Sequence, residues 1–532
     1  MTQGRMLRRS VELYRPELLP LFLSFHKSET QHKWEIQNMA DAVKLSTFLH
    51  SKMLLSPELN RNSPCYIARR IVQQYIKLKY IATFPAHEID EYAAIGDQEY
   101  DEVCMVHHLL HNANSTTDME NVYRLASMLG ISHHGDSWND IMNFVRCALP
   151  FAEQTESLLI RGSDDRSVLD TTTKTNKYNT STIPCAVQQQ AWISRASCTS
   201  SSVSLEAYTL CEHIRQELLL ASLSINNQNI REVFDIKMQS IRLRVADCLG
   251  LRGLYDDGAF ECIISPSGTD AELIATSVAL ARLQSIASAS NNGTLTLIDT
   301  AQGETGSGSV AASNGKHFSK LSPSGDIVEP GKHLRGFPST KANCIQIPAR
   351  QDDGAIQNAD EIVRQSVVDA LTTSPTAEQN VVLLHVVMGS KTGLSCPSLQ
   401  LVDELTSTYP ERLIVVVDAC QMRLDNLSLA EYISRGFLIL VTGSKFFAGV
   451  PFCGGVLAPT RHVDELESSN ATICLPVGYG DYFSKYEIPS NMVNTRSRFP
   501  SRMNVGLLLR WETALVNMEL YSSIPSTMIG EI

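Results

Sequence analysis

The chain has 532 residues, enough for two or three domains that each bury a hydrophobic core. It is 43% hydrophobic and 19% charged, as in globular proteins, and its formal net charge of −12 argues against nucleic acid or an anionic membrane as a partner. Thirteen cysteines without CxxC pairs favour reduced thiols in a cytoplasmic enzyme over a disulfide framework or a zinc module.

Residues 1–153 are predicted to form an all-helical domain. Apolar residues recur at helical spacing in segments 34–53 and 64–84, and Thr117-x-x-Glu120 is a capping box that opens another helix. Adjacent histidines occur twice, but no carboxylate or cysteine pattern accompanies them, so no metal site is predicted. No apolar run reaches the roughly 18–20 residues that span a bilayer, so no membrane association is expected.

Residues 154–204 are polar and poor in aliphatic side chains. Their composition predicts a connector, or an ordered loop that covers a site. Two helical patterns follow between Val203 and Gly250.

Beyond Gly250, predicted strands alternate with predicted helices. The strands are 260–265, 294–299, 381–386, 413–417, 437–442 and 454–457, and the helices are 271–284, 359–371, 398–407, 427–435 and 504–521. This alternation predicts an α/β domain over residues 205–503, with a mostly parallel sheet and helices on both of its faces.

The segment Ser265-Pro-Ser-Gly-Thr-Asp-Ala-Glu-Leu273 follows the first of these strands and opens a helix. Free backbone amides at a helix start attract phosphate, and Gly268 allows close approach, while Ser267 and Thr269 add hydroxyl groups. The alternative is an ordinary helix start, because Thr269-x-x-Glu272 is also a capping box.

Asp418 and Gln421 follow the apolar run Ile414-Val-Val-Val417. An acid at the end of a strand is often a helix cap or a solvated loop residue. In an enzyme that uses pyridoxal 5′-phosphate (PLP), such an acid pairs with the protonated pyridine nitrogen. Gln421 is then placed to hydrogen-bond the phenolic oxygen of the ring.

Lys445 lies among small and aromatic residues just beyond the predicted strand 437–442. These neighbours give little reason for a solvated charge, and a desolvated lysine is a good nucleophile toward an aldehyde. The sequence therefore predicts PLP held on Lys445 as a Schiff base, with Thr442 and Ser444 near its phosphate.

Lys391 is the competing lysine, because Gly389-Ser-Lys-Thr-Gly393 also follows an apolar strand. That strand precedes the Asp418 strand, whereas the Schiff-base lysine should follow it. We therefore interpret Ser390 as a hydroxyl on the cofactor side. No GxxxxGK[ST], HExxH or GxSxG motif points to another chemistry.

The order Ser267-Gly268-Thr269, then Asp418 and Gln421, then Lys445 resembles that of the fold-type I PLP-dependent transferases, closest to the class V aminotransferase and cysteine desulfurase branch. The resemblance covers residues 200–520. It implies that Asp418-Ala-Cys-Gln421 holds the ring, and that Lys445 precedes a turn and an antiparallel strand. It also implies a homodimer.

The resemblance has three gaps. The loop after the second strand offers Glu304 and Thr305 but no aromatic ring to stack on the pyridine, and Cys474 is a weak counterpart of a desulfurase cysteine. Residues 504–532 are expected to hold a terminal helix and only the start of a small domain that in the family supplies an arginine for the substrate carboxylate. The remaining candidates for that arginine are Arg496, Arg498 and Arg502.

The expected function is that of a PLP-dependent enzyme acting on an amino acid or related amine, as an aminotransferase or as a carbon–sulfur or other lyase. Two alternatives stay open, a catalytically inactive PLP-binding or structural protein and an amino-acid decarboxylase. A decarboxylase is ranked lower because Ser444 stands where the group II decarboxylases place a histidine.

Overall fold

A computed structural model describes residues 68–69, 72, 140, 144, 147–170, 173, 175–184, 200–223, 229–286, 292–373, 376–468 and 474–525. The described residues form two compact units. The first holds those up to Leu158, together with 211–223 and 229–233, and the second holds 159–184, 200–210 and 234–525. Most of the helices predicted within residues 1–153 lie outside the described residues.

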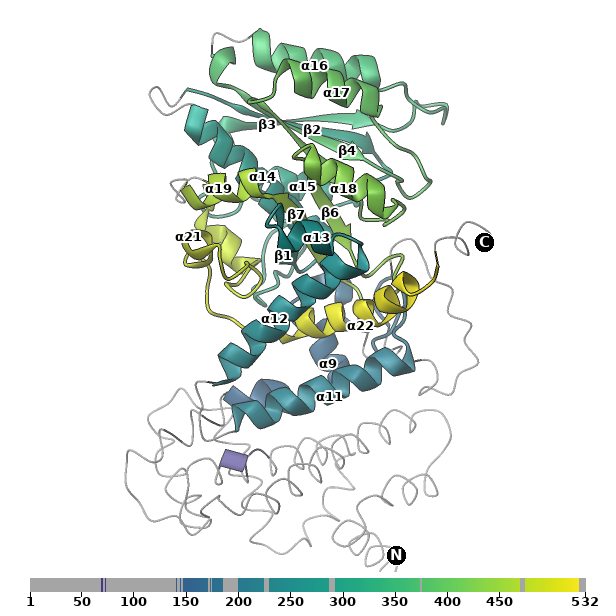
Figure 1. The fold of residues 1–532 in the computed structure, drawn as a ribbon, viewed down its shortest axis with the longest axis vertical. Coiled ribbons are helices and arrows are strands. Elements are labelled where there is room, and N and C mark those ends of the chain that lie inside the picture. Colours follow the sequence, from purple (N-terminus) through teal and green to yellow (C-terminus); the bar gives the residue numbers. More distant parts are fainter. Residues whose placement is uncertain are drawn as a thin grey trace, which may run out of the picture. The chain divides into compact units, whose positions relative to one another are not determined.

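The second unit is built on a seven-stranded sheet (Figure 1). Its strands are β1 (Phe260–Ser265), β2 (Leu295–Gln302), β3 (Ala342–Pro348), β4 (Val381–Val387), β5 (Leu413–Asp418), β6 (Leu438–Thr442) and β7 (Gly454–Pro459). The strand order is β1-β7-β6-β5-β4-β2-β3. All neighbouring pairs are parallel except those of β7, which runs antiparallel to both β6 and β1. The mostly parallel sheet is confirmed, as is the antiparallel strand after Lys445.

Helices alternate with these strands along the chain. The α-helices are α9 (Thr155–Ile160), α11 (Leu205–Ser222), α12 (Asn229–Cys248), α13 (Arg252–Asp256), α14 (Gly268–Ile286), α15 (Ser309–Ser313), α16 (Asp360–Thr372), α17 (Leu399–Thr408), α18 (Asn426–Ser434), α19 (Thr460–Ser468), α21 (Val493–Arg496) and α22 (Val505–Ser522). Short 3₁₀ helices are η2 (Leu149–Ala152), η3 (Asp165–Ser167), η4 (Ser339–Lys341), η5 (Ala377–Gln379) and η6 (Val477–Asp481). In the described part of the chain no helix is both long and apolar enough to cross a membrane.

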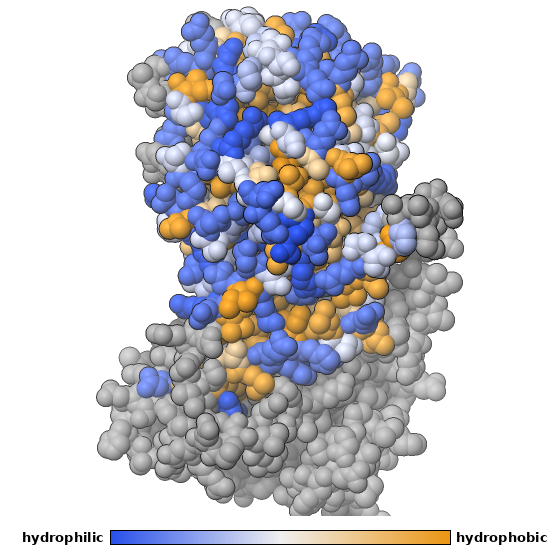
Figure 2. All heavy atoms as spheres, in the orientation of Figure 1, coloured by the Kyte–Doolittle hydropathy of each residue, from blue (hydrophilic) through white to orange (hydrophobic). Residues whose placement is uncertain are grey.

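Alternate residues of each strand point to opposite faces of the sheet, so a strand that is buried along its whole length must be covered on both faces. Leu383 and Val416 belong to one core together with α14, whereas α16, α17 and α18 contact the strands and present an outer surface that is largely hydrophilic (Figure 2). All seven residues of β4 are buried. The predicted helices on both faces are therefore present.

Several elements were not expected from the sequence, and they include β3 and α19 as well as the short helices α9, α13, α15 and α21. Strand β3 lies at the sheet edge, and only one of its seven residues is buried, so it lacks the continuous apolar run that marks the central strands. Helix α19 is only nine residues long and buries His462, Val463 and Leu466.

Candidate active site

The loops after β2, β4, β5 and β6 surround a small cavity at the carboxyl ends of the parallel strands. This edge is where open α/β sheets bind ligands. The cavity is lined by Glu304, Thr305, Gly306, Val387, Gly389, Ser390, Lys391, Asp418, Gln421 and Lys445. Four residues predicted from the sequence therefore share one cavity, namely Ser390, Asp418, Gln421 and Lys445.

Lys445 is held in a tight turn just beyond β6. Its carbonyl accepts a hydrogen bond from the amide of Ala448 at 3.1 Å, and the amide of Gly449 donates to the carbonyl of Gly443 at 3.1 Å. The side chain is partly buried. The turn thus fixes the backbone of a lysine that reaches the cavity.

Asp418 ends β5 beside this lysine. Its Oδ1 accepts from the amide of Cys420 at 3.0 Å, and Gln421 is nearly buried. Burial raises the pKa of the Cys420 thiol well above its usual range; the charge of Asp418 adds to this rise and that of Lys445 opposes it. Asp418 and Lys445 therefore both lie close enough to Cys420 to act on its charge.

A buried polar layer lies behind Asp418, between α14 and the sheet, and was not anticipated from the sequence. Glu272 Oε2 is 3.2 Å from His385 Nδ1, and His385 Nε2 is 3.5 Å from Asp299 Oδ1. Burial raises the pKa of Glu272 well above its usual range, and the charges of Asp418 and Asp299 raise it further. Burial and like charge therefore both disfavour the ionised form of Glu272.

The start of α14 is capped by Ser267, whose Oγ accepts from the amide of Asp270 at 3.2 Å and donates to the Asp270 carboxylate. The alternative capping box Thr269-x-x-Glu272 is wrong, because the Glu272 side chain turns toward His385. Residue 268 has no room for a side chain: a Cβ there would lie 2.7 Å from Cys420 Sγ and 2.8 Å from Thr442 Cγ2. The glycine therefore brings the helix start against the ends of β5 and β6.

The hydroxyl groups that were predicted to contact the cofactor or its phosphate differ in their hydrogen bonds. Ser390 Oγ donates to Glu304 Oε2 at 2.8 Å, and Thr442 Oγ1 donates to the carbonyl of Cys420 at 2.7 Å. Ser444 Oγ is buried and has no hydrogen-bond partner in the part of the chain that the structure describes. A buried hydroxyl without a partner fits a site that a polar ligand completes.

The close packing of β7 against this loop leads to a prediction. A Cβ on Gly454 would lie 2.4 Å from the carbonyl carbon of Ser267 and 2.6 Å from the amide nitrogen of Gly268. We expect Gly454→Ala to lower the free energy of unfolding by about 1–3 kcal/mol, since backbone must move. Urea unfolding would measure it.

Gly455→Ala is the matched control, because a Cβ on residue 455 would have more room. The atom nearest to that Cβ would be the carbonyl oxygen of Ile263, at 3.2 Å. The control should lose much less stability than Gly454→Ala. Equal losses in the two variants would contradict the close approach of β7 to the Ser267 loop.

Lys391 also lines the cavity, but its Nζ donates to the carbonyl of Thr305 at 2.6 Å. The loop that carries it is fixed by Glu304, which accepts from the amide and hydroxyl of Thr392 as well as from Ser390. Burial alone would raise the pKa of Glu304, but these hydrogen bonds and Arg350 lower it to about 2. Lys391 is thus tied to the cavity wall, whereas no hydrogen bond to Lys445 Nζ is recorded among the described residues.

The polar segment that was predicted as a connector reaches the start of α14. Arg166 lies in η3 and donates to both oxygens of Asp164, to Ser267 Oγ at 3.2 Å and to Thr269 Oγ1 at 3.4 Å. Arg510 of α22 holds the same segment by donating to the carbonyls of Leu159, Arg161 and Gly162. Neither arginine was singled out from the sequence, because nothing in the local pattern links them to a loop about a hundred residues or more away.

Asp270 gives this region a measurable pH dependence. Burial raises the pKa of Asp270 to about 7, and the nearby Asp164 charge adds to the rise, against hydrogen bonding by Ser267 and the charge of Arg166. The folded protein binds this proton more tightly than the unfolded chain, so its stability falls as the pH rises from about 4 to about 7. Asp270→Asn cannot ionise, so it should not lose this stability. The stability that the substitution preserves is on the order of 4 kcal/mol in the free energy of unfolding at pH 8 and near zero at pH 4.

Urea unfolding of both proteins between pH 4 and pH 8 tests this expectation. The exposed Asp464 provides the control substitution Asp464→Asn, which should follow the pH profile of the unsubstituted chain. If the free energy of unfolding varies with pH in the same way in Asp270→Asn and in the unsubstituted chain, Asp270 is not the source of the pH dependence.

Four further candidates from the sequence do not line the cavity, namely Arg496, Arg498, Arg502 and Cys474. Arg496 pairs with Asp235 and donates to the carbonyl of Ile488, and Arg502 donates to the carbonyl of Gly480. Cys474 is fully buried in the core against α14. Among the described residues no group of three or more histidine, cysteine and acidic side chains is placed to hold a metal ion.

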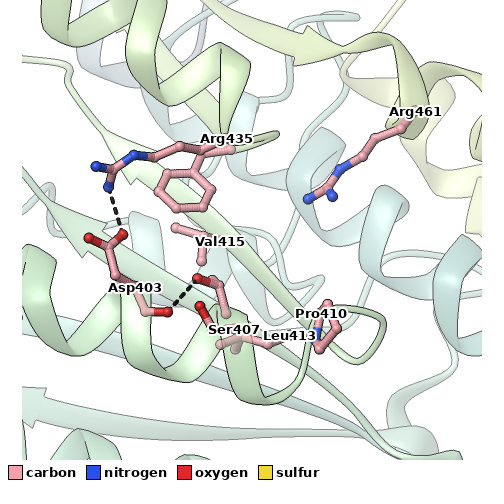
Figure 3. A pocket seen from close by; sticks show the side chains of 9 residues that line it. Asp403, Ser407, Pro410, Leu413, Val415, Arg435 and Arg461 are labelled. Atoms are coloured by element: carbon pink, nitrogen blue, oxygen red, sulfur yellow. Dashed lines mark hydrogen bonds and ion pairs between the residues drawn. The ribbon is translucent and has the colours of Figure 1, made fainter.

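A second cavity opens at the opposite edge of the sheet (Figure 3). It lies where β5 and β6 begin, and Arg435 and Arg461 point toward it from α18's end and from α19. Arg435 is already paired with Asp403 at 2.7 Å and with Glu431. No lysine is among the residues that line this cavity, so the chemistry is expected at the edge that holds Lys445.

No protein-family model and no curated protein matches the chain. Among solved structures, it is similar to 4-hydroxyphenylacetaldehyde synthase from Rhodiola rosea, with 12% identity over 61% of this chain and 60% of that chain and a TM-score of 0.37. It is also similar to tryptophan decarboxylase from Catharanthus roseus in complex with L-tryptophan, with 17% identity over 52% and 53% of the two chains and a TM-score of 0.33. A third similar structure is ureidoglycine–glyoxylate aminotransferase from Bacillus subtilis, with 10% identity over 54% of this chain and 59% of that chain and a TM-score of 0.32. The chain matches 60% or less of the length of each of these three structures.

Proposed function

We propose that this chain is a PLP-dependent enzyme that acts on an amino acid or related amine, as an aminotransferase or as a carbon–sulfur or other lyase. The observation that carries the proposal is the meeting of Asp418, Gln421 and Lys445 in one cavity at the carboxyl edge of the sheet. The start of α14 lies against the same strand ends through Gly268. An acid, an amine and an anion-binding helix start are the parts that PLP requires.

Bound PLP supplies an aldehyde for an amine and an electron-withdrawing ring. Each neighbouring side chain has a role that follows from its position. The Nζ of Lys445 attaches the cofactor, and later takes and returns a proton at the substrate carbon. Asp418 would pair with the ring nitrogen, and the raised pKa of Glu272 behind it disfavours a second buried negative charge there. Gln421 orients the ring through its phenolic oxygen.

The phosphate is assigned to the start of α14. Thr269 and Ser444 contribute hydroxyl groups there, and Gly268 brings this helix start against the ends of β5 and β6. Ser267 and Thr442 act mainly by shaping the loop, because their hydroxyl hydrogens are donated to Asp270 and to the carbonyl of Cys420. Ser390 positions Glu304 on the opposite wall of the cavity.

Purified protein tests the proposal in two stages. PLP added to the protein should give a visible absorbance band, and borohydride reduction should fix one PLP on the peptide that contains Lys445. The PLP-loaded protein should then change its spectrum with some members of a panel of amino acids and amines. A protein that stays colourless with PLP would overturn the proposal, and one that binds PLP but responds to no amine would favour the catalytically inactive alternative.

The reaction class is separated by product analysis. A 2-oxo acid together with transfer of the amino group indicates an aminotransferase, sulfide or another released group indicates a lyase, and carbon dioxide indicates a decarboxylase. A homodimer and a cytoplasmic location belong to the same proposal, and sedimentation of the purified protein would test the first of them.

A further inference from the structure

We infer that Arg166, from the polar segment far upstream of the sheet, is a direct ligand of the cofactor's phosphate ester. This inference rests on the proposed function and adds a cation to a site that otherwise offers backbone amides and hydroxyl groups. The ligand chemistry is that of a phosphate monoester, which carries close to two negative charges at neutral pH.

The orientation of the guanidinium is the first argument. An arginine has five N–H donors in a fixed fork. In Arg166, Nε and one hydrogen of Nη2 are used by the Asp164 carboxylate. The remaining edge, with Nη1 and the other hydrogen of Nη2, faces Thr269 Oγ1 at 3.4 Å and Ser267 Oγ at 3.2 Å. Two donors, one on Nη1 and one on Nη2, thus point at the helix start where the phosphate is proposed.

The second argument is that this side chain is held in place before any ligand binds. The guanidinium carbon lies 4.5 Å from the centroid of the Phe452 ring and 5.5 Å from that of Phe318, and the side chain is only 13% exposed. Asp164 itself is buried and caps η3 by accepting from the amide of Arg166. A guanidinium fixed by two rings and a carboxylate loses little freedom when it binds an anion.

Charge is the third argument. Two acidic side chains, Asp164 and Asp270, lie near the start of α14, and the charge of Asp164 adds to the rise in the pKa of Asp270. An anion placed there without a cation would meet like charge, which is unfavourable in a buried site. Arg166 supplies the positive charge that offsets these acids. The buried Ser444 hydroxyl, which lacks a partner, independently indicates that a polar ligand belongs in this part of the molecule.

Two titrations test the inference, one with PLP and one with pyridoxal, which has the same aldehyde but no phosphate. We expect Arg166→Gln to weaken the affinity for PLP about 10- to 100-fold, the range for loss of a hydrogen bond to a charged group. The affinity for pyridoxal should stay the same. Arg161→Gln, which changes an exposed arginine in the same segment, is the control and should bind both compounds like the unsubstituted chain.

Arg166→Gln leaves the buried Asp164 carboxylate without its partner, so the double variant Asp164→Asn/Arg166→Gln is titrated beside it. Circular dichroism checks that both variants are folded. If the folded variants keep the PLP affinity of the unsubstituted chain, or lose affinity for PLP and pyridoxal equally, the inference is overturned. Failure of the proposed function looks different, because the unsubstituted chain itself would then not attach PLP to Lys445.

Discussion

Replacement of Lys445 by alanine is expected to abolish the covalent retention of PLP. The substitution removes the amine that reaches the cavity from the turn after β6. Loss of the proton-transfer base alone should slow the reaction by about 10²–10⁴-fold, and loss of cofactor attachment adds to that. Absorbance of the purified variant and mass spectrometry after borohydride reduction would measure both effects.

Lys391→Ala is the matched control, because Lys391 lines the same cavity. Its Nζ already donates to the carbonyl of Thr305, so this variant should keep the covalent attachment at Lys445. Attachment that persists in Lys445→Ala and disappears in Lys391→Ala would reverse the assignment of the two lysines.

The second large effect is expected for stability, at Arg510. This fully buried arginine donates to four backbone carbonyls, those of Leu159, Arg161, Gly162 and Phe452. Burial lowers the pKa of Arg510 to about 10, which leaves it charged at neutral pH. Arg510→Met keeps much of the volume but leaves these acceptors without a donor, and we expect a loss of about 3–5 kcal/mol in the free energy of unfolding.

Urea unfolding measures this loss, and Arg364→Met serves as its control. Arg364 is an exposed arginine on α16 that pairs with Glu404 on α17, and exposed pairs contribute at most about 1 kcal/mol. A loss for Arg510→Met as small as that of the control would show that the four carbonyls find other donors. A large loss in the free energy of unfolding would support the role of Arg510 in fixing residues 159–162, which precede Arg166.

Much of the α/β unit could be predicted because its buried strands consist of continuous apolar runs. β1 was placed at both of its ends, and β4 and β5 to within one residue. Asp418 and Lys445 could be found because each follows such a run, so both had to emerge at the same edge of the sheet. The cavity that Lys445, Asp418 and Gln421 line is therefore a consequence of strand order that the sequence already implied.

The remaining site residues contact partners that lie far away in the sequence, and a local sequence pattern does not reveal such contacts. Glu272 and His385 are single polar residues within apolar segments, and only the packing of α14 on β4 brings them together. Arg166 and Asp164 lie in a polar segment whose composition resembles that of a connector. The hydroxyl groups illustrate a further limit, because the type of residue at Ser267 and Thr442 could be foreseen but not that their hydrogens are donated to other partners.

The position of β7 has a consequence for the way this chain folds as it is synthesised. β1 is an edge strand whose hydrogen-bonded neighbour in the sheet is β7, so that Ser265 pairs with Gly454. At about 5–20 residues per second, a ribosome needs roughly 10–40 s between these two strands. During that interval the nascent chain holds an apolar strand and the Ser267 loop without the strand that completes them, the situation in which unpaired edges recruit chaperones or aggregate. Soluble yield should therefore depend on chaperone supply during translation more than on the equilibrium stability of the finished fold.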